Sequence, residues 1–193
     1  MTVMRDEVVK ALAGFTVRGD EDGLIPSFNV FVNQLPVEFW NGFARRMMEA
    51  APPDRKKEVE EALINCAYEC GYHTGYGIIT SDEFQQVVGP MVTEGAKDVL
   101  RGAYAVFTAW GWAKSGIVQI KEGERMVVRA TDYYEADGEP GDMRAFMIRG
   151  VSTAFFELAY SDEYPDGMGK FQTEQTQGLE CGDPFGEFVV TEK

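Results

Sequence analysis

Apolar residues recur every three to four positions along the chain as far as residue 112, and this period is typical of helices. Proline and glycine mark several expected helix ends, because proline suits a first helical turn and glycine suits a stop. Ser81 is placed to cap a short helix that Gly89 and Pro90 would close. The expected helices cover residues 2–15, 35–50, 53–77, 81–88 and 90–112.

After residue 114 the period shortens towards two, which indicates strands. Two strands near 116–121 and 125–133 are expected to form a hairpin around the polar sequence KEGE. A helix capped by Asp142 is expected next. The chain then ends in a second pair of strands around the turn CGDP.

Helices that precede a small antiparallel sheet define an α+β fold. We expect N-terminal helices packed on a small antiparallel sheet of about four strands, with one helix between two hairpins. The chain has 193 residues and no internal repeat or linker, so a single domain, 1–193, is expected. Residues 1–55 form its N-terminal helical extension and residues 56–193 its core.

The long helix from residue 53 holds two of the three cysteines and the single histidine of the chain. Residues spaced by four and three positions form one stripe on this helix, and the stripe is expected to face the core, where free cysteine behaves as a small hydrophobe. Cys66, Cys70 and His73 are also ligand types for zinc, but one helix cannot surround a metal, so no metal site is favoured. The stripe consists of Val59, Leu63, Cys66, Cys70, His73 and Gly77.

The formal net charge of -14 argues against a nucleic-acid partner, because phosphates require a basic surface. It also disfavours an anionic membrane surface. No apolar run approaches the roughly 20 residues of a membrane span, and the acidic N-terminus does not resemble a signal peptide. Three cysteines do not form a disulfide framework. We therefore expect a cytoplasmic protein, and the composition identifies no cofactor.

Glycine and aromatic residues concentrate in the long helix and in the second long helix, at 90–112. A glycine allows either another helix to pack closely or a flat ligand to lie against the backbone. Aromatic side chains likewise fit a core or, at 12% of the chain, the walls of an apolar pocket. Under the ligand interpretation, the pocket lies between the two helices and the sheet and is lined by Tyr72, His73, Gly75, Tyr76, Phe107 and Trp110.

The strand sequence KFQTEQTQ has no apolar face, which is unusual for a strand inside a sheet. We favour an edge strand that is exposed on both sides. The charge of Glu174 would oppose the pairing of this edge with another strand. The alternative is that one of its faces lines a polar pocket. Arg129, in the middle of an earlier strand, is expected to pair with a surface acid rather than with the carboxylate of a ligand.

The closing segment, TEQTQGLECGDPFGEFVV, resembles the superfamily of 4-vinyl-reductase-like domains and transport-particle (TRAPP) subunits. A similar closing strand occurs in proteins resembling L-2-amino-thiazoline-4-carboxylic acid hydrolase. The resemblance implies that residues 56–193 form an α+β, 4-vinyl-reductase-like core, often dimeric through its helices, with an internal pocket for a small hydrophobic molecule.

In phenol-sensing members of the superfamily, a glutamate and cysteines of this strand region hold zinc beside the pocket. Glu174 matches the glutamate, and the resemblance makes it a candidate ligand contact. Gln177 and Gly186 stand where the cysteines are expected, and Cys181 is displaced from both places. The metal site of the family is therefore expected to be absent from this chain.

Three functions remain open at this point. The favoured one is a homodimeric domain that binds a small hydrophobic or aromatic molecule, with tetrapyrrole-related molecules among the candidates. The first alternative is a hydrolase of a small cyclic C–N bond, with His73 as general base and Cys181 or Cys70 as nucleophile. The second is a non-catalytic assembly subunit that needs no pocket.

Overall fold

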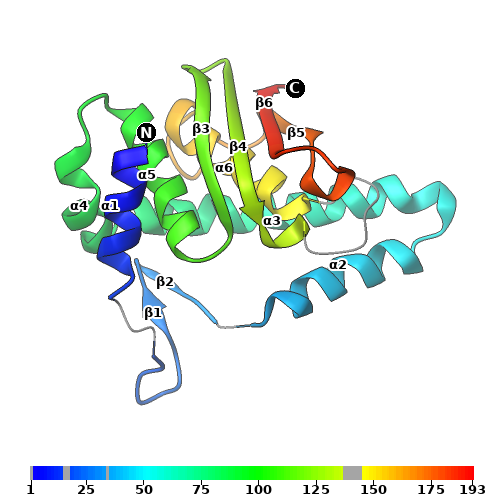
Figure 1. Cartoon of the computed structure of the whole chain (residues 1–193), viewed down its shortest axis with the longest axis horizontal. Helices are drawn as coiled ribbons and strands as arrows, with labels where there is room; N and C mark the ends of the chain where they lie inside the picture. Colours follow the sequence, from blue (N-terminus) through cyan, green and yellow to red (C-terminus); the bar gives the residue numbers. More distant parts are fainter. Residues whose placement is uncertain (1, 15–17, 34, 137–144) are drawn as a thin grey trace.

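The computed structural model describes residues 2–14, 18–33, 35–136 and 145–193. Its helices and its four-stranded antiparallel sheet confirm the expected α+β class (Figure 1). The helices are α1 (Thr2–Leu12), α2 (Val37–Ala50), α3 (Lys56–Ile79), α4 (Asp82–Val87), α5 (Ala96–Ala109) and α6 (Phe146–Tyr160), with short 3-10 turns η1 (Pro53–Arg55), η2 (Gly89–Met91), η3 (Tyr134–Ala136) and η4 (Leu179–Cys181). The strands are β1 (Pro26–Ser27), β2 (Val30–Phe31), β3 (Ala113–Lys121), β4 (Arg125–Tyr133), β5 (Phe171–Gln177) and β6 (Gly186–Glu192).

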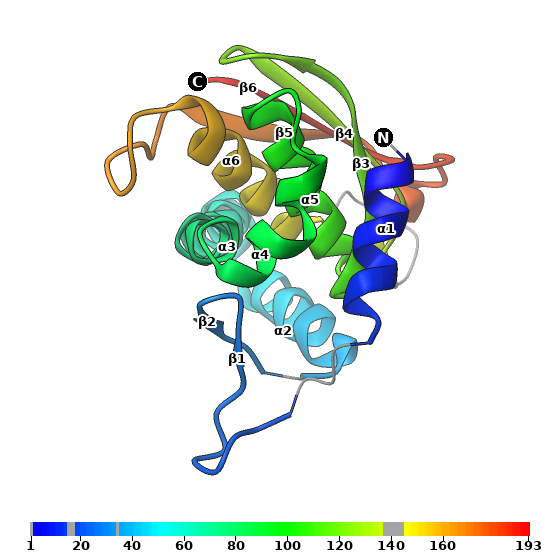
Figure 2. The ribbon, with the colours of Figure 1, turned by 90° about the vertical axis from the view of Figure 1, so that its left-hand side faces the viewer.

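The four long strands form one antiparallel sheet in the order β3-β4-β6-β5. Helices α5 and α6 cover one face of the sheet, and α3 lies beyond them as an outer layer (Figure 2). On the other face of the sheet, Arg129 is exposed and pairs with Glu187 of the neighbouring strand, with Nε and Oε2 2.8 Å apart. The expected surface ion pair of Arg129 is therefore confirmed, as are the two strands of the first hairpin.

Helices α3 and α6 pack unusually closely because both carry glycine at the contact. A Cβ on Gly71 would lie 3.1 Å from Val151 Cγ2, and one on Gly75 would lie 2.8 Å from Leu158 Cδ1. A Cβ on Gly150 would come within 2.6 Å of the backbone nitrogen of Tyr68. The glycines of α3 that the sequence drew attention to therefore serve helix packing.

The predicted core face of α3 is wrong, because the buried face is rotated about the helix axis from the predicted stripe. Cys66, Cys70 and His73 are exposed, whereas Ala67, Gly71, Gly75 and Ile78 are buried together with Tyr72. Small residues decide the contact, because only they let the backbone of α6 approach. The remaining members of the predicted stripe, Val59, Leu63 and Gly77, are half-buried.

Helix α5 begins at Ala96 rather than at residue 90. Gly95 has φ +60°, which ends any helix running through it. The buried carboxylate of Asp98 accepts hydrogen bonds from the backbone nitrogens of Thr93 and Glu94, both 2.8 Å long. Burial alone would raise the pKa of Asp98, but these bonds and the guanidinium of Arg101 hold it well below its usual range. The helical period of the sequence does not indicate these contacts of Asp98.

Strand β5 is an edge strand, as expected, but it is not exposed on both sides. Phe171, Thr173 and Gln175 are buried against α6, and the residues between them are exposed. Thr173 Oγ1 and Thr153 Oγ1 share a hydrogen bond of 2.7 Å, and Gln175 Nε2 donates to Glu180 Oε1 over 2.8 Å, whereas Gln177 Oε1 has no partner among the described residues. A polar strand face can therefore be part of the core. The expected cap Asp142 lies outside the described residues.

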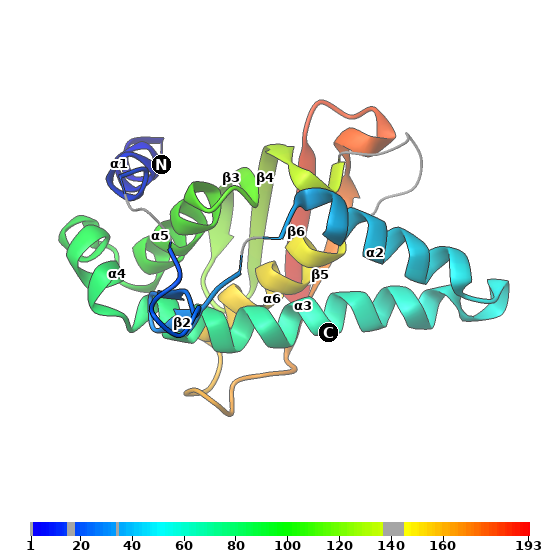
Figure 3. The ribbon, with the colours of Figure 1, turned by 90° about the horizontal axis from the view of Figure 1, so that it is seen from below.

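The N-terminal part of the chain lies against α5 and α3. Helix α1 packs on α5, β2 lies against α3, and α2 runs beside the first half of α3 (Figures 1 and 3). None of the residues of α2 is buried. The short β1–β2 hairpin was not expected, because its two-residue turn contains Phe28 and Asn29 rather than glycine.

Candidate ligand-binding site

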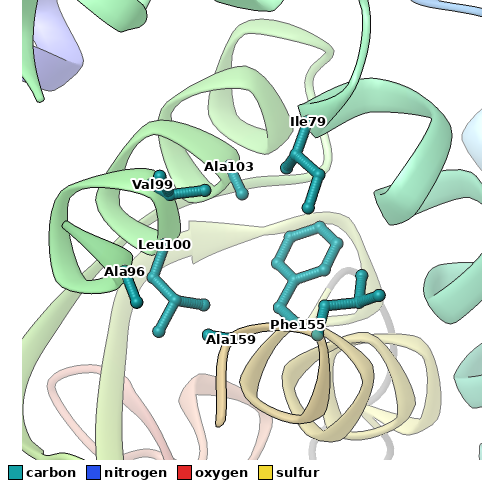
Figure 4. A pocket seen from close by; sticks show the side chains of 8 residues that line it. Ile79, Ala96, Val99, Leu100, Ala103, Phe155 and Ala159 are labelled. Carbon is teal, nitrogen blue, oxygen red and sulfur yellow. The ribbon is translucent and has the colours of Figure 1, made fainter. Parts of the chain in front are cut away.

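A cavity of about 160 Å³, partly open to solvent, lies between the C-terminal end of α3 and the facing sides of α5 and α6. Its wall contains apolar side chains only, and Figure 4 shows Phe155 facing the residues of α5 across the space. Alanine at three wall positions leaves the volume that larger side chains would fill. The lining residues are Ile79, Ala96, Val99, Leu100, Ala103, Phe155, Leu158 and Ala159.

The size and chemistry of this cavity restrict what it can hold. For comparison of size, an enclosed apolar cavity of about 150 Å³ holds one benzene molecule. The wall here offers no charged or hydrogen-bonding side chain, so a charged ligand would lose its hydration without compensation. The cavity therefore suits a compact apolar molecule of about one ring.

Two of the residues predicted from the sequence adjoin this cavity without lining it. Gly75 faces Phe155 and Leu158, which are both wall residues. Phe107 meets Phe155 edge-on, with ring centroids 6.2 Å apart. The lining residues of α5 and α6 were not predicted. Ala96 and Ala103, seven positions apart on one helix face, were the available signal.

Tyr72, His73 and Tyr76 gather instead around Tyr164, in the segment between α6 and β5. Tyr76 stacks on Tyr164 with ring centroids 3.8 Å apart, and His73 Nδ1 lies 3.0 Å from the Tyr164 hydroxyl. The hydroxyl of Tyr72 accepts a hydrogen bond from the backbone nitrogen of Gly167. These aromatic side chains fasten the 161–170 segment to α3.

The other predicted contacts lie elsewhere in the fold. Trp110 packs against Phe28, and Glu174 is exposed on β5. Cys181 lies in η4, between β5 and β6. The structure therefore divides the predicted set among separate environments, and His73 and Cys181 as a catalytic pair stay a prediction.

Cys66, Cys70 and His73 carry the side-chain types that bind zinc. In the part of the chain that the structure describes, no group of three or more His, Cys, Asp or Glu side chains could hold a metal ion. Cys66 and Cys70 lie on the solvent side of α3, and the Cys70 sulfur is 3.7 Å from the Thr74 hydroxyl.

Two glutamates, Glu135 and Glu157, are buried in the structure, and the sequence did not indicate this. Burial raises the pKa of Glu135 to about 8, against the opposing effect of hydrogen bonds from the backbone nitrogens of Met147 and Ile148. Glu157 accepts bonds of 2.7 Å from the nitrogens of Lys170 and Phe171. Each carboxylate holds a loop or a helix end, so both have a structural role.

The described residues form an α+β domain with an apolar cavity between three helices, and comparison with known proteins bears on the fold. No family model and no curated protein matches the sequence. The chain is similar in structure to the phenol-responsive sensory domain of the transcription activator PoxR, solved with phenol. The TM-score is 0.71 at 14% identity, over 100% of this chain and 91% of that one.

A second similar structure is a trafficking protein particle complex subunit 3 from Naegleria fowleri, covalently bound to palmitic acid. The TM-score is 0.55 at 13% identity, over 81% of this chain and 92% of that one. Both structures support the fold expected from the 4-vinyl-reductase-like and TRAPP resemblance. The branch resembling the thiazoline hydrolase stays a prediction. Among the described residues, no helix is both long and apolar enough to cross a membrane.

Proposed function

We propose that this protein is a sensor or carrier domain that binds a small apolar molecule in the cavity between α3, α5 and α6. The observation that carries the proposal is an apolar space of about 160 Å³ between three helices, partly open to solvent. Such a space persists only where its walls cannot collapse, and close helix packing at Gly71, Gly75 and Gly150 keeps α3 and α6 fixed. The two similar structures, one with phenol and one covalently bound to palmitic acid, support ligand binding by this fold.

Filling the cavity tests the proposal. Ala159 lies half-buried in the wall, and Ala159→Leu adds three heavy atoms to the space without disturbing a helix contact at glycine. We expect benzene binding, measured by isothermal titration calorimetry and by ligand-observed NMR, to weaken at least tenfold. Ala62→Leu on the exposed side of α3 is the matched control and should bind as the wild type does. Equal benzene affinity of the two variants would show that benzene does not bind in this cavity.

Gly75→Leu tests the same cavity by displacing two of its wall residues. The new side chain would push Phe155 and Leu158 into the space, because both already lie within 3.2 Å of a Cβ placed on Gly75. We expect binding to be lost. Circular dichroism must show a folded protein for this result to count, since α3 and α6 meet at this point.

We also propose that the protein is a homodimer joined through α2. Phe39, Phe43 and Met47 form one stripe on this helix and are 49, 48 and 42% exposed. The stripe is symmetric about Phe43, so a second copy running antiparallel would set Phe39 against Met47 and Phe43 against itself. Exposed apolar stripes of this kind commonly mark interfaces.

The oligomeric state tests this second part independently of the ligand. Light scattering after size exclusion should give twice the 21.5 kDa of one chain. Phe43→Ser should give a folded monomer, and Arg45→Ser on the opposite face of α2 should remain a dimer. A monomeric wild-type protein would refute the dimer and leave the cavity unaffected.

A further inference from the structure

The tip of the β1–β2 hairpin inserts one aromatic ring into the core. Phe28 is 4% exposed and belongs to a buried apolar cluster with Ile78, Phe84 and Val106. Its ring meets Trp110 edge-on, with ring centroids 5.4 Å apart. Across residues 18–33, all of which the structure describes, Phe28 is the only buried side chain. One ring therefore supplies the buried anchor of this whole segment.

The backbone that carries this ring is strained. Phe28 has φ +51° and Asn29 has φ +59°, so the hairpin turn has left-handed geometry at both central positions. Such turns strongly prefer Asn-Gly, because a bulky side chain at positive φ crowds its own backbone. Burial of the ring offsets this strain. Withdrawal of the ring would release it.

Few other contacts hold the hairpin in place. Its ladder consists of the pairs Pro26–Phe31 and Ser27–Val30. Val30 rests against α3 at Gly77, where an added Cβ would lie 2.8 Å from Val30 Cγ1. Before β1 the chain runs out from the helices as an extended loop (Figures 1 and 2). A two-stranded hairpin of this length is not stable by itself, so it stays closed only while Phe28 is seated.

We propose that the socket of Phe28 is a latent binding site for a single aromatic ring, which the protein fills with its own side chain until a ligand displaces it. The ring contacts Trp110 and shares its buried cluster with Ile78, Phe84 and Val106, so the surroundings of the socket are apolar or aromatic. It therefore selects an uncharged monocyclic arene about the size of toluene, which is the phenylalanine side chain as a free molecule. Binding there opens the hairpin. This site shares no residue with the cavity between α3, α5 and α6, so it does not depend on the proposed function.

Two substitutions in the turn should change, in opposite directions, how readily a free arene displaces the Phe28 ring. Phe28→Asn removes the ring but retains a residue that accepts positive φ, so the socket is vacant and the turn is still favoured. We expect it to bind toluene at least tenfold more tightly than the wild type. Asn29→Gly keeps the ring and relieves the turn, so Phe28 is held more firmly and toluene binding should weaken at least threefold. Binding is measured by titration calorimetry and by the fluorescence of the tryptophans.

Both variants are also made with Ala159→Leu, so that the cavity between α3, α5 and α6 does not contribute to the signal. In the wild type, saturating toluene should speed hydrogen exchange of the amides of residues 26–32, because the hairpin opens. Equal toluene affinity in the wild type, Phe28→Asn and Asn29→Gly would overturn the proposal. So would saturable binding at the socket that leaves hairpin exchange unchanged. If Phe28→Asn does not fold, the Asn29→Gly affinity and the exchange experiment still decide the question.

Discussion

Helices α6 and α2 are similar in length, and both carry several large apolar side chains, yet they occupy opposite extremes of burial. Ten of the fifteen residues of α6 are buried, between α3 and the sheet, whereas none of the fourteen residues of α2 is buried. On α6 both carboxylate oxygens of the buried Glu157 accept hydrogen bonds from backbone nitrogens. On α2 the apolar stripe faces solvent. The comparison separates a helix that determines stability from one that is available for a partner.

A matched pair of glycines gives the largest expected effect. Gly150 on α6 has no room for a Cβ beside Tyr68, whereas a Cβ on Gly42 of α2 would have no heavy atom within 4 Å. We expect Gly150→Ala to lower the free energy of unfolding by about 4 kcal/mol or to prevent folding. Gly42→Ala should raise it by up to about 1 kcal/mol through helix propensity. Urea unfolding measures both, and effects of equal sign would contradict the comparison.

A matched pair of carboxylates comes next. Glu157 is fully buried and accepts bonds from Tyr68 and from the backbone before β5, whereas Glu49 on α2 is exposed. Glu157→Gln leaves charge-assisted bonds unmade and should cost about 2–3 kcal/mol of unfolding free energy. Glu49→Gln should change it by less than about 0.5 kcal/mol, because exposed ion pairs contribute little. A comparable loss in both variants would show that burial does not set the difference.

The sequence predicted the elements of this fold better than it predicted their contacts. The strands near 116–121 and 125–133 were found because alternation along a half-buried strand is directly visible. The face of α3 was missed because Cys66, Cys70 and His73 match the helical period, while the observed contact is set by the absence of side chains at Gly71 and Gly75. Sequence periodicity does not reveal which of two plausible faces meets another helix.

The candidate site was predicted less well for a related reason. Tyr72 and Tyr76 are aromatic and close to glycines, but Tyr164, far along the chain, takes up their rings. The cavity instead results from missing volume at Ala96, Ala103 and Ala159, on two helices separated by the first hairpin of the sheet. A space defined by small residues from distant segments requires the tertiary packing to be known.

The N-terminal end of α6 supplies a pH-dependent prediction. The pKa of Glu135 is raised to about 8 in the folded protein, chiefly by burial and further by nearby Glu180. The folded state therefore holds this proton more tightly than the unfolded chain. Its contribution to stability is complete below the unfolded pKa, near 4.3, and is lost as the pH rises towards 8. Denaturant unfolding at pH 5, 6, 7 and 8 should show a fall of up to about 1.4 kcal/mol per pH unit.

Glu135→Gln should remove most of that fall, because glutamine does not titrate. Asp98 has the opposite dependence, since its pKa is lowered and its stabilisation is lost only in strong acid. It therefore does not contribute between pH 5 and pH 8. A wild-type profile that is flat over this range, or a Glu135→Gln profile that is equally steep, would exclude Glu135 as the source.

The smallest expected effect concerns Phe43 of α2. Phe43→Ala removes a side chain that is 48% exposed, so the free energy of unfolding of a single chain should fall by less than about 1 kcal/mol. The buried Phe156 of α6 is the matched residue, and Phe156→Ala should cost about 3–5 kcal/mol. The wild-type melting temperature should rise with protein concentration if α2 joins two copies, because dimer formation stabilises the folded state by mass action. Phe43→Ala should abolish that concentration dependence, whereas Phe156→Ala should preserve it at a lower temperature. Wild-type melting that does not depend on concentration would refute the dimer.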